Sequence, residues 1–161
     1  MNEQVSKESM KSDKINEKKW TKELMDAGFT VIPNIIIERQ LVLGLDALDI
    51  NILMHICTYW WTPENKPHPA KRTIAEAMGI TPRTVQRRIK KLQDVGFVLR
   101  EERRVDKGAS KTNNYHLDGL IKAAAPYALE KIQERKKIAD ERKATAGRKG
   151  KARVDVVTSE E

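Results

Sequence analysis

The sequence predicts a mainly α-helical protein with one small β-hairpin, and three observations support this prediction. Apolar residues recur at helical spacing from Asp46 to Trp61. Helix-ending and helix-starting signals meet at Gly79, which is typical of two short helices joined by a tight turn. Strand-like residues from Phe97 to Leu117 flank a turn sequence around Gly108, which is typical of a hairpin.

Length and composition limit the architecture to one compact domain with arms. The chain has 161 residues, of which 39% are hydrophobic and only 5% aromatic, which leaves little material for a large enzyme fold or cofactor pocket. No apolar run approaches the roughly 20 residues that cross a bilayer, and the start lacks a secretion signal. The single cysteine, Cys57, fits a reducing compartment. We therefore expect a cytoplasmic protein.

Positive charge is concentrated in two segments of the chain. Residues 71–111 hold twelve Lys and Arg against five Asp and Glu, and residues 130–153 hold ten against four. Such basic segments attract a polyanion by releasing its counterions, so nucleic acid is the favoured partner. The alternative is that the charges only solvate helix surfaces.

The N-terminal third is expected to consist of a flexible polar arm at 1–17 and an extension at 18–44. A short helix is predicted at Lys18–Ala27, while the sequence does not decide the secondary structure of the apolar patch at 34–43. The predicted helix at Asp46–Trp61 is apolar on more than one side. We expect the extension or a partner subunit to cover it.

The next two predicted helices are defined by their end signals. Thr73 and Glu76 form a T-x-x-E capping box at the start of the first helix, and Gly79 can end it in the left-handed conformation. Thr81 then caps the second helix, with Pro82 at its first position.

The second helix is predicted to have one apolar side and one basic side. Val85, Ile89 and Leu92 form its buried stripe, followed by Val95 before Gly96. The residues expected opposite this stripe are Arg83, Arg87, Lys90 and Lys91, flanked by Thr84 and Gln86, with Arg88 near the edge. These side-chain types suit base edges in the major groove.

The segment Thr73–Leu92, followed by Gly96-Phe97-Val98, resembles the winged helix-turn-helix proteins of bacterial regulators and of plasmid or phage replication. Its A-x-x-x-G, T-V-x-R and L-x-x-x-G elements have that family's order and spacing. The resemblance covers residues 45–118 and implies a winged helix-turn-helix domain with N-terminal and C-terminal helical extensions. Arg88 departs from it, because many such units have a hydrophobic residue there; Ile89 is expected to take the apolar role.

The hairpin at 97–117 would then be the wing, next to a recognition helix at 82–95. Its basic residues could contact phosphates or the minor groove, although an exposed charged hairpin can also serve only to prevent edge aggregation. The full set of predicted DNA contacts is Lys71, Arg72, Thr81, Arg83, Thr84, Gln86, Arg87, Arg88, Lys90, Lys91, Arg103, Arg104, Lys107, Lys111 and Asn113.

The C-terminal part is predicted as a helical extension at 119–144 and a flexible basic tail at 145–161. Asp118 can cap a helix to Ala125, Pro126 is expected to interrupt it, and Tyr127–Ala144 is rich in helix-forming residues. The tail contains Gly147-Arg148-Lys149-Gly150-Lys151, which suits a phosphate backbone or plain solvation.

Taken together, these features and the resemblance predict a sequence-specific, homodimeric protein that binds double-stranded DNA and is associated with the bacterial nucleoid, with transcriptional regulation as the favoured role. Plasmid or phage replication initiation at origin DNA is one alternative, and a protein-interaction adaptor with the same fold is another. His55, His68 and His116 lack metal-ligand spacing, and no nucleophile or phosphate-loop motif is present. We therefore expect no enzyme activity, cofactor, metal, small-molecule ligand or membrane partner.

Overall fold

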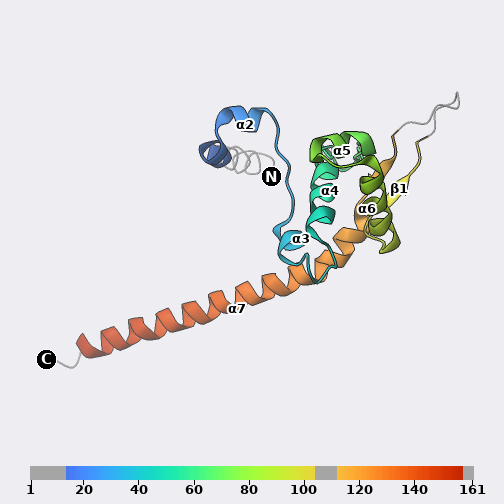
Figure 1. The fold of residues 1–161 in the computed structure, drawn as a ribbon. Helices are drawn as coiled ribbons and strands as arrows, with labels where there is room; N and C mark the ends of the chain where they lie inside the picture. The colour runs from blue at the N-terminus through green and yellow to red at the C-terminus, as the bar shows by residue number, and fades with distance from the viewer. Residues whose placement is uncertain (1–13, 104–111, 158–161) are drawn as a thin grey trace.

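The computed structural model describes residues 14–103 and 112–157, with side chains as far as residue 146. A three-helix body carries a two-stranded hairpin, and helices extend from it at both ends of the chain (Figure 1). The architecture confirms the predicted fold class. In order, the elements are a helix at 14–20, α2 (Lys22–Asp26), α3 (Asn34–Glu38), α4 (Ala47–Cys57), α5 (Lys71–Met78), α6 (Pro82–Asp94), β1 (Leu99–Glu101), β2 (Asn114–His116) and α7 (Asp118–Val157).

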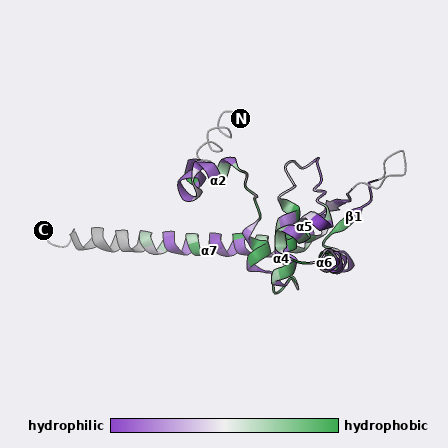
Figure 2. Cartoon of the chain, turned by 45° about the horizontal axis from the view of Figure 1, so that its top comes forward, coloured by the Kyte–Doolittle hydropathy of each residue, from purple (hydrophilic) through white to green (hydrophobic). Residues whose placement is uncertain are grey.

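The hydrophobic core lies between α4, α5, α6 and the hairpin. Ile52 of α4, Ile74 of α5 and Val85 of α6 are fully or almost fully buried there, and Tyr115 of β2 joins them. The backbone N–H of Tyr115 donates to the carbonyl of Pro67 at 2.8 Å, which ties the loop after α4 to the hairpin. In Figure 2, α4 is largely hydrophobic and α6 largely hydrophilic, as expected for a central helix and a surface helix.

Helix α4 begins as predicted but ends earlier. Asp46 and Asp49 form a reciprocal capping box at its start. Its end lies at Cys57 instead of Trp61, because Tyr59 and Trp60 donate three residues back and so tighten the last turn. Trp61, which follows this turn, is 71% exposed.

The N-terminal extension divides into a part that packs on the body and a part that does not. Ile36 and Leu43 pack against the core, whereas α2 has no buried residue and lies away from the body (Figure 1). The helix at 14–20 also begins within the segment expected to be an unstructured arm, while residues 1–13 lie outside the described part. Helix α2 remains exposed because three of its five residues are charged and provide no apolar stripe.

Helix α5 begins earlier than the capping box predicted. Its N-cap is Ala70, with extended backbone after Pro69, so Thr73 lies inside the helix. Lys71 and Arg72 are good helix formers and extend the helix backwards. Glu76, freed from a capping role, accepts a hydrogen bond from Arg72 Nε at 2.7 Å.

The hairpin strands are shorter than the sequence indicated, and they bring α7 against the end of α6. Strands β1 and β2 are antiparallel, with Leu99 opposite His116 and Glu101 opposite Asn114. A methyl group on Gly119 would lie 1.7 Å from the carbonyl oxygen of Gly96. Only glycine allows this close contact, and it positions Leu120 N to donate to the Phe97 carbonyl at 3.2 Å.

Helix α7 is continuous from Asp118 to Val157, although Pro126 was expected to break it and residues beyond 144 to be unstructured. The bond that Pro126 cannot donate would go to the carbonyl of Lys122, an exposed residue, so water can satisfy that group. Among the described residues, none of the helices combines the length and apolar character needed to cross a membrane.

Candidate nucleic-acid interface

Local signals in the sequence set the start and angle of α6. Gly79 has φ 65° and ends α5 in the left-handed region. The Thr81 hydroxyl then accepts a hydrogen bond from Thr84 N at 3.1 Å, and Pro82 occupies the first helical position. These three predicted features of the turn are confirmed.

The inner side of α6 anchors it to the body. Val85, Ile89 and Leu92 are buried, as the predicted stripe required. Val95, expected to continue the stripe, is instead 54% exposed, because it lies after the last helical residue, in the turn that ends at Gly96.

The outer side of α6 is open to solvent and basic. Arg83 and Arg87 are exposed, and neither has a hydrogen-bond or ion-pair partner within the described parts of the chain. Their guanidinium groups therefore keep their donors available. A shallow depression of about 330 Å³ runs along this side, lined by Thr81, Arg83, Thr84, Gln86, Arg87 and Lys90.

Neighbouring candidate residues form weak surface contacts that a ligand could displace. Lys71 Nζ of α5 donates to Gln86 Oε1 at 3.1 Å, so that α5 and α6 share one polar edge. Lys90 pairs with Asp94 at 3.0 Å along the same helix. Exposed pairs of this kind contribute at most about 1 kcal/mol and are screened by salt.

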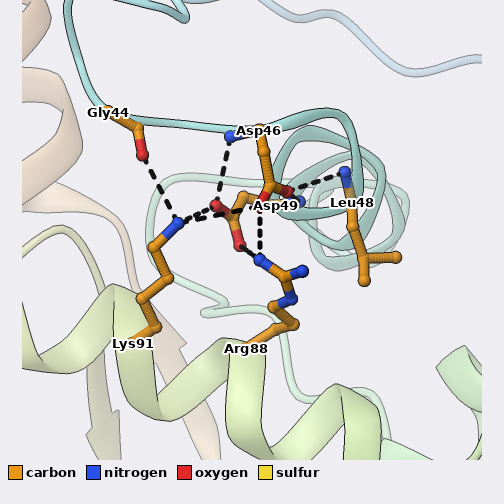
Figure 3. A network of polar contacts seen from close by, with 6 residues as sticks. All are labelled: Gly44, Asp46, Leu48, Asp49, Arg88 and Lys91. Carbon is orange, nitrogen blue, oxygen red and sulfur yellow. Dashed lines mark hydrogen bonds and ion pairs between the residues drawn. The ribbon is translucent and has the colours of Figure 1, made fainter.

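Arg88 and Lys91 are directed differently from the other cations of α6. Both reach back to the start of α4, where they contact Asp46 and Asp49 (Figure 3). Lys91 Nζ lies 2.5 Å from Asp49 Oδ2, and Arg88 Nη1 lies 3.4 Å from Asp49 Oδ1. The prediction that Lys91 belongs to the outward basic side is therefore wrong.

Asp49 is the centre of this contact. Its side chain is fully buried, and its Oδ2 also accepts the backbone N–H of Asp46 at 3.2 Å. Arg88 is 24% exposed, and its buried Nε has no partner in the described residues. A buried carboxylate requires such partners, because an unpaired ion is costly to remove from water. We call Asp46, Asp49, Arg88 and Lys91 the α4–α6 ion cluster.

The pKa of Asp46 is held below its usual range, first by the hydrogen bond from the Asp49 amide and then by Arg88.

Sequence reasoning missed Asp49. Its signal was available, since Asp49 shares a helical side with Ile52, Leu53 and Ile56, where an acidic residue needs a buried counterion.

Only some of the predicted DNA-contacting residues of the hairpin lie within the described part of the chain. Arg103 and Asn113 lie at the two ends of the described hairpin and are partly buried. Arg104, Lys107 and Lys111 lie outside the described residues. Glu101 accepts from His116 Nε2 at 3.0 Å and from Asn114 Nδ2 at 3.2 Å, which lowers the pKa of this carboxyl.

The geometry defines a helix-turn-helix unit with a wing: α5, the Gly79 turn, the outward α6 and the hairpin. Residues 43–98 match the family model of the helix-turn-helix domain, the class of module that inserts its second helix into the major groove. The chain therefore contains a winged helix-turn-helix domain.

Two solved structures align with the chain, and the first of them has a similar fold. The N-terminal domain of the DnaD protein from Geobacillus kaustophilus HTA426 aligns over 73% of this chain and 94% of its own, with 15% identity and a TM-score of 0.50. The transcriptional regulator PA3341 aligns over 63% of this chain and 69% of its own, with 21% identity and a TM-score of 0.37. No curated protein matches the sequence.

Proposed function

We propose that the chain binds double-stranded DNA in a sequence-dependent way, as a homodimer that regulates transcription. The main support is that Arg83 and Arg87, on the side of α6 away from the core, are exposed and have no partner among the residues that the structure describes. A helix of 13 residues is about 20 Å long, and the major groove, about 12 Å wide, admits such a helix.

We assign the candidate residues to three roles. Arg83 and Arg87 carry free forked donors and suit guanine O6 and N7, with Gln86 between them. Lys71, Arg72, Thr81, Thr84 and Lys90 border this group and suit phosphates. Arg103, Asn113 and the wing residues Arg104, Lys107 and Lys111 would follow the adjacent backbone.

Arg88 and Lys91 are given a supporting role in this proposal. Their charges are already neutralised by the α4–α6 ion cluster, so they would release few counterions when DNA binds. They would fix the angle of α6, and the salt dependence of binding should change little when either is replaced.

Substitution of Arg87 and Lys107 tests the proposal. We expect Arg87→Ala to cost about 1–3 kcal/mol on the preferred duplex and to relax base preference. We expect Lys107→Ala to weaken all duplexes alike and to reduce the salt slope by about one. The preferred duplex would first be selected from a random pool.

Lys22→Ala is the matched control, because it removes one positive charge from α2, away from α6. Equal retention on duplex DNA by all three variants would refute the assignment of α6. Retention of the wild-type chain at background level on both duplex and single-stranded DNA would favour a protein-docking adaptor instead.

The dimer is supported by apolar residues that remain outside the core. Leu41 is 87% exposed and Val42 is 60% exposed in the turn after α3, close to Ile37, which is also exposed. An apolar patch of this kind is typical of an interaction surface. Sedimentation equilibrium should give a dimer mass for the wild-type chain and a monomer mass for Leu41→Glu.

A further inference from the structure

An apolar cavity of about 220 Å³ lies between α3, α4 and the first turns of α7. Each of the three helices contributes to its wall. The residues used here are Ile36 from α3, Ile50, Leu53 and Cys57 from α4, Trp60 just after it, and Leu120 from α7.

The wall offers nothing to a charged ligand. None of the described residues that line the cavity is Asp, Glu, Lys, Arg or His. Burial raises the pKa of the Cys57 thiol, which therefore stays uncharged at neutral pH. A carboxylate, an ammonium or a peptide bond would lose its hydrogen bonds to water here without replacement.

The volume of the cavity limits the size of the ligand that it can hold. An apolar cavity of about 150 Å³ stays dry and admits benzene, and this one is larger at about 220 Å³. Its wall is far smaller than the roughly 800 Å² that each partner buries in a stable interface.

We propose that this cavity is a binding site for a small uncharged apolar molecule, a single aromatic ring or an alkyl chain of roughly six to eight carbons. Composition and motifs in the sequence did not indicate such a ligand. Residues from 31 to 121 form the site, so it exists only in the folded chain.

The test uses the full chain with Trp20→Phe and Trp61→Phe, two exposed tryptophans whose removal leaves Trp60 as the only tryptophan. Bromobenzene is the probe, because its heavy atom quenches indole fluorescence on contact. The charged 4-bromobenzenesulfonate is the matched probe with the same ring. We expect saturable quenching by bromobenzene and only linear collisional quenching by the sulfonate.

Cys57 provides a second readout that does not depend on fluorescence. We expect saturating benzene to slow labelling of this thiol by methyl methanethiosulfonate at least threefold. Ile50→Phe, which fills the cavity, should abolish both saturable quenching and protection, whereas Leu99→Phe, on exposed β1 outside the wall, should keep both. Thermal unfolding followed by circular dichroism shows that each variant is folded, and Ile36→Phe replaces Ile50→Phe if that variant is not.

Three results would overturn the proposal. The first is equal, linear quenching by both probes. The second is unchanged saturable quenching in a folded cavity-filling variant. The third is Cys57 protection that rises with protein concentration and without benzene, since that would mean that a side chain of a second copy fills the cavity.

Discussion

Replacing Asp49 by Asn tests how α6 is held at its angle. Asn keeps the size of the side chain and an oxygen that can accept the Asp46 N–H, which lies 3.2 Å from Asp49 Oδ2. It removes the negative charge that faces Lys91 at 2.5 Å and Arg88 at 3.4 Å. The substitution therefore isolates the electrostatic part of the α4–α6 ion cluster.

The size of the stability loss caused by Asp49→Asn depends on how deeply each partner is buried. Breaking a fully buried pair costs about 3–5 kcal/mol. Here the carboxylate is fully buried, but Lys91 is 43% exposed and can turn to water, and Arg88 retains Asp46. We therefore expect Asp49→Asn to lower the free energy of unfolding by about 2–3 kcal/mol.

Urea unfolding followed by circular dichroism measures this loss. Asp46→Asn is the control, because Asn is an equally good N-cap and the Asp46 side chain is 48% exposed, so its loss should stay near 1 kcal/mol. A double-mutant cycle with Arg88→Gln should give a coupling energy of at least about 1 kcal/mol. Equal stabilities of Asp49→Asn and Asp46→Asn, or no coupling, would show that the buried carboxylate does not hold α6.

Three further predictions concern other parts of the molecule. Gly119→Ala should lower the free energy of unfolding in urea by about 1–3 kcal/mol, because its methyl group would lie 1.7 Å from the Gly96 carbonyl oxygen. Gly147→Ala in the same helix should raise the free energy of unfolding, and a rise in both variants would contradict the close contact at Gly119. Pro126→Ala should restore one helical bond and raise the unfolding temperature, and a lower temperature would mean that the proline is needed. The folded-state pKa of Asp46 lies below its ordinary value of 3.8. The stabilising effect of this carboxylate is therefore complete above pH 3.8 and is lost as the pH falls through the folded-state pKa. The stability difference between wild type and Asp46→Asn should shrink below about pH 4, and a difference that does not depend on pH would refute an electrostatic origin.

Part of the site could be predicted because its determinants are local. Three features act within a few residues of sequence: the turn at Gly79, the Thr81 cap and the start of the helix at Pro82. Neighbouring residues therefore determine the course of the chain from α5 into α6. The buried stripe of α6 is also a local periodicity. It was enough to place Arg83 and Arg87 on the outward side.

Other features depend on which segments meet in space. Lys91 looks like the outward cations of α6 in sequence, and helical spacing puts Arg88 only near the edge of the apolar stripe. The approach of α4, about forty residues earlier, turns both side chains inward. Gly119 gives no turn signal, and its role appears only when α7 lies on the backbone of Gly96.

The sequence by itself determined the two short helices, their tight turn, the hairpin and the outward position of Arg83 and Arg87, because capping, backbone conformation and side-chain periodicity act over a few residues. The tertiary structure alone decided which cations are neutralised, where α7 docks, and that an apolar cavity remains beside α4. Charge pairing, close packing and cavities depend on distances between segments far apart in the chain, and no local pattern encodes those distances.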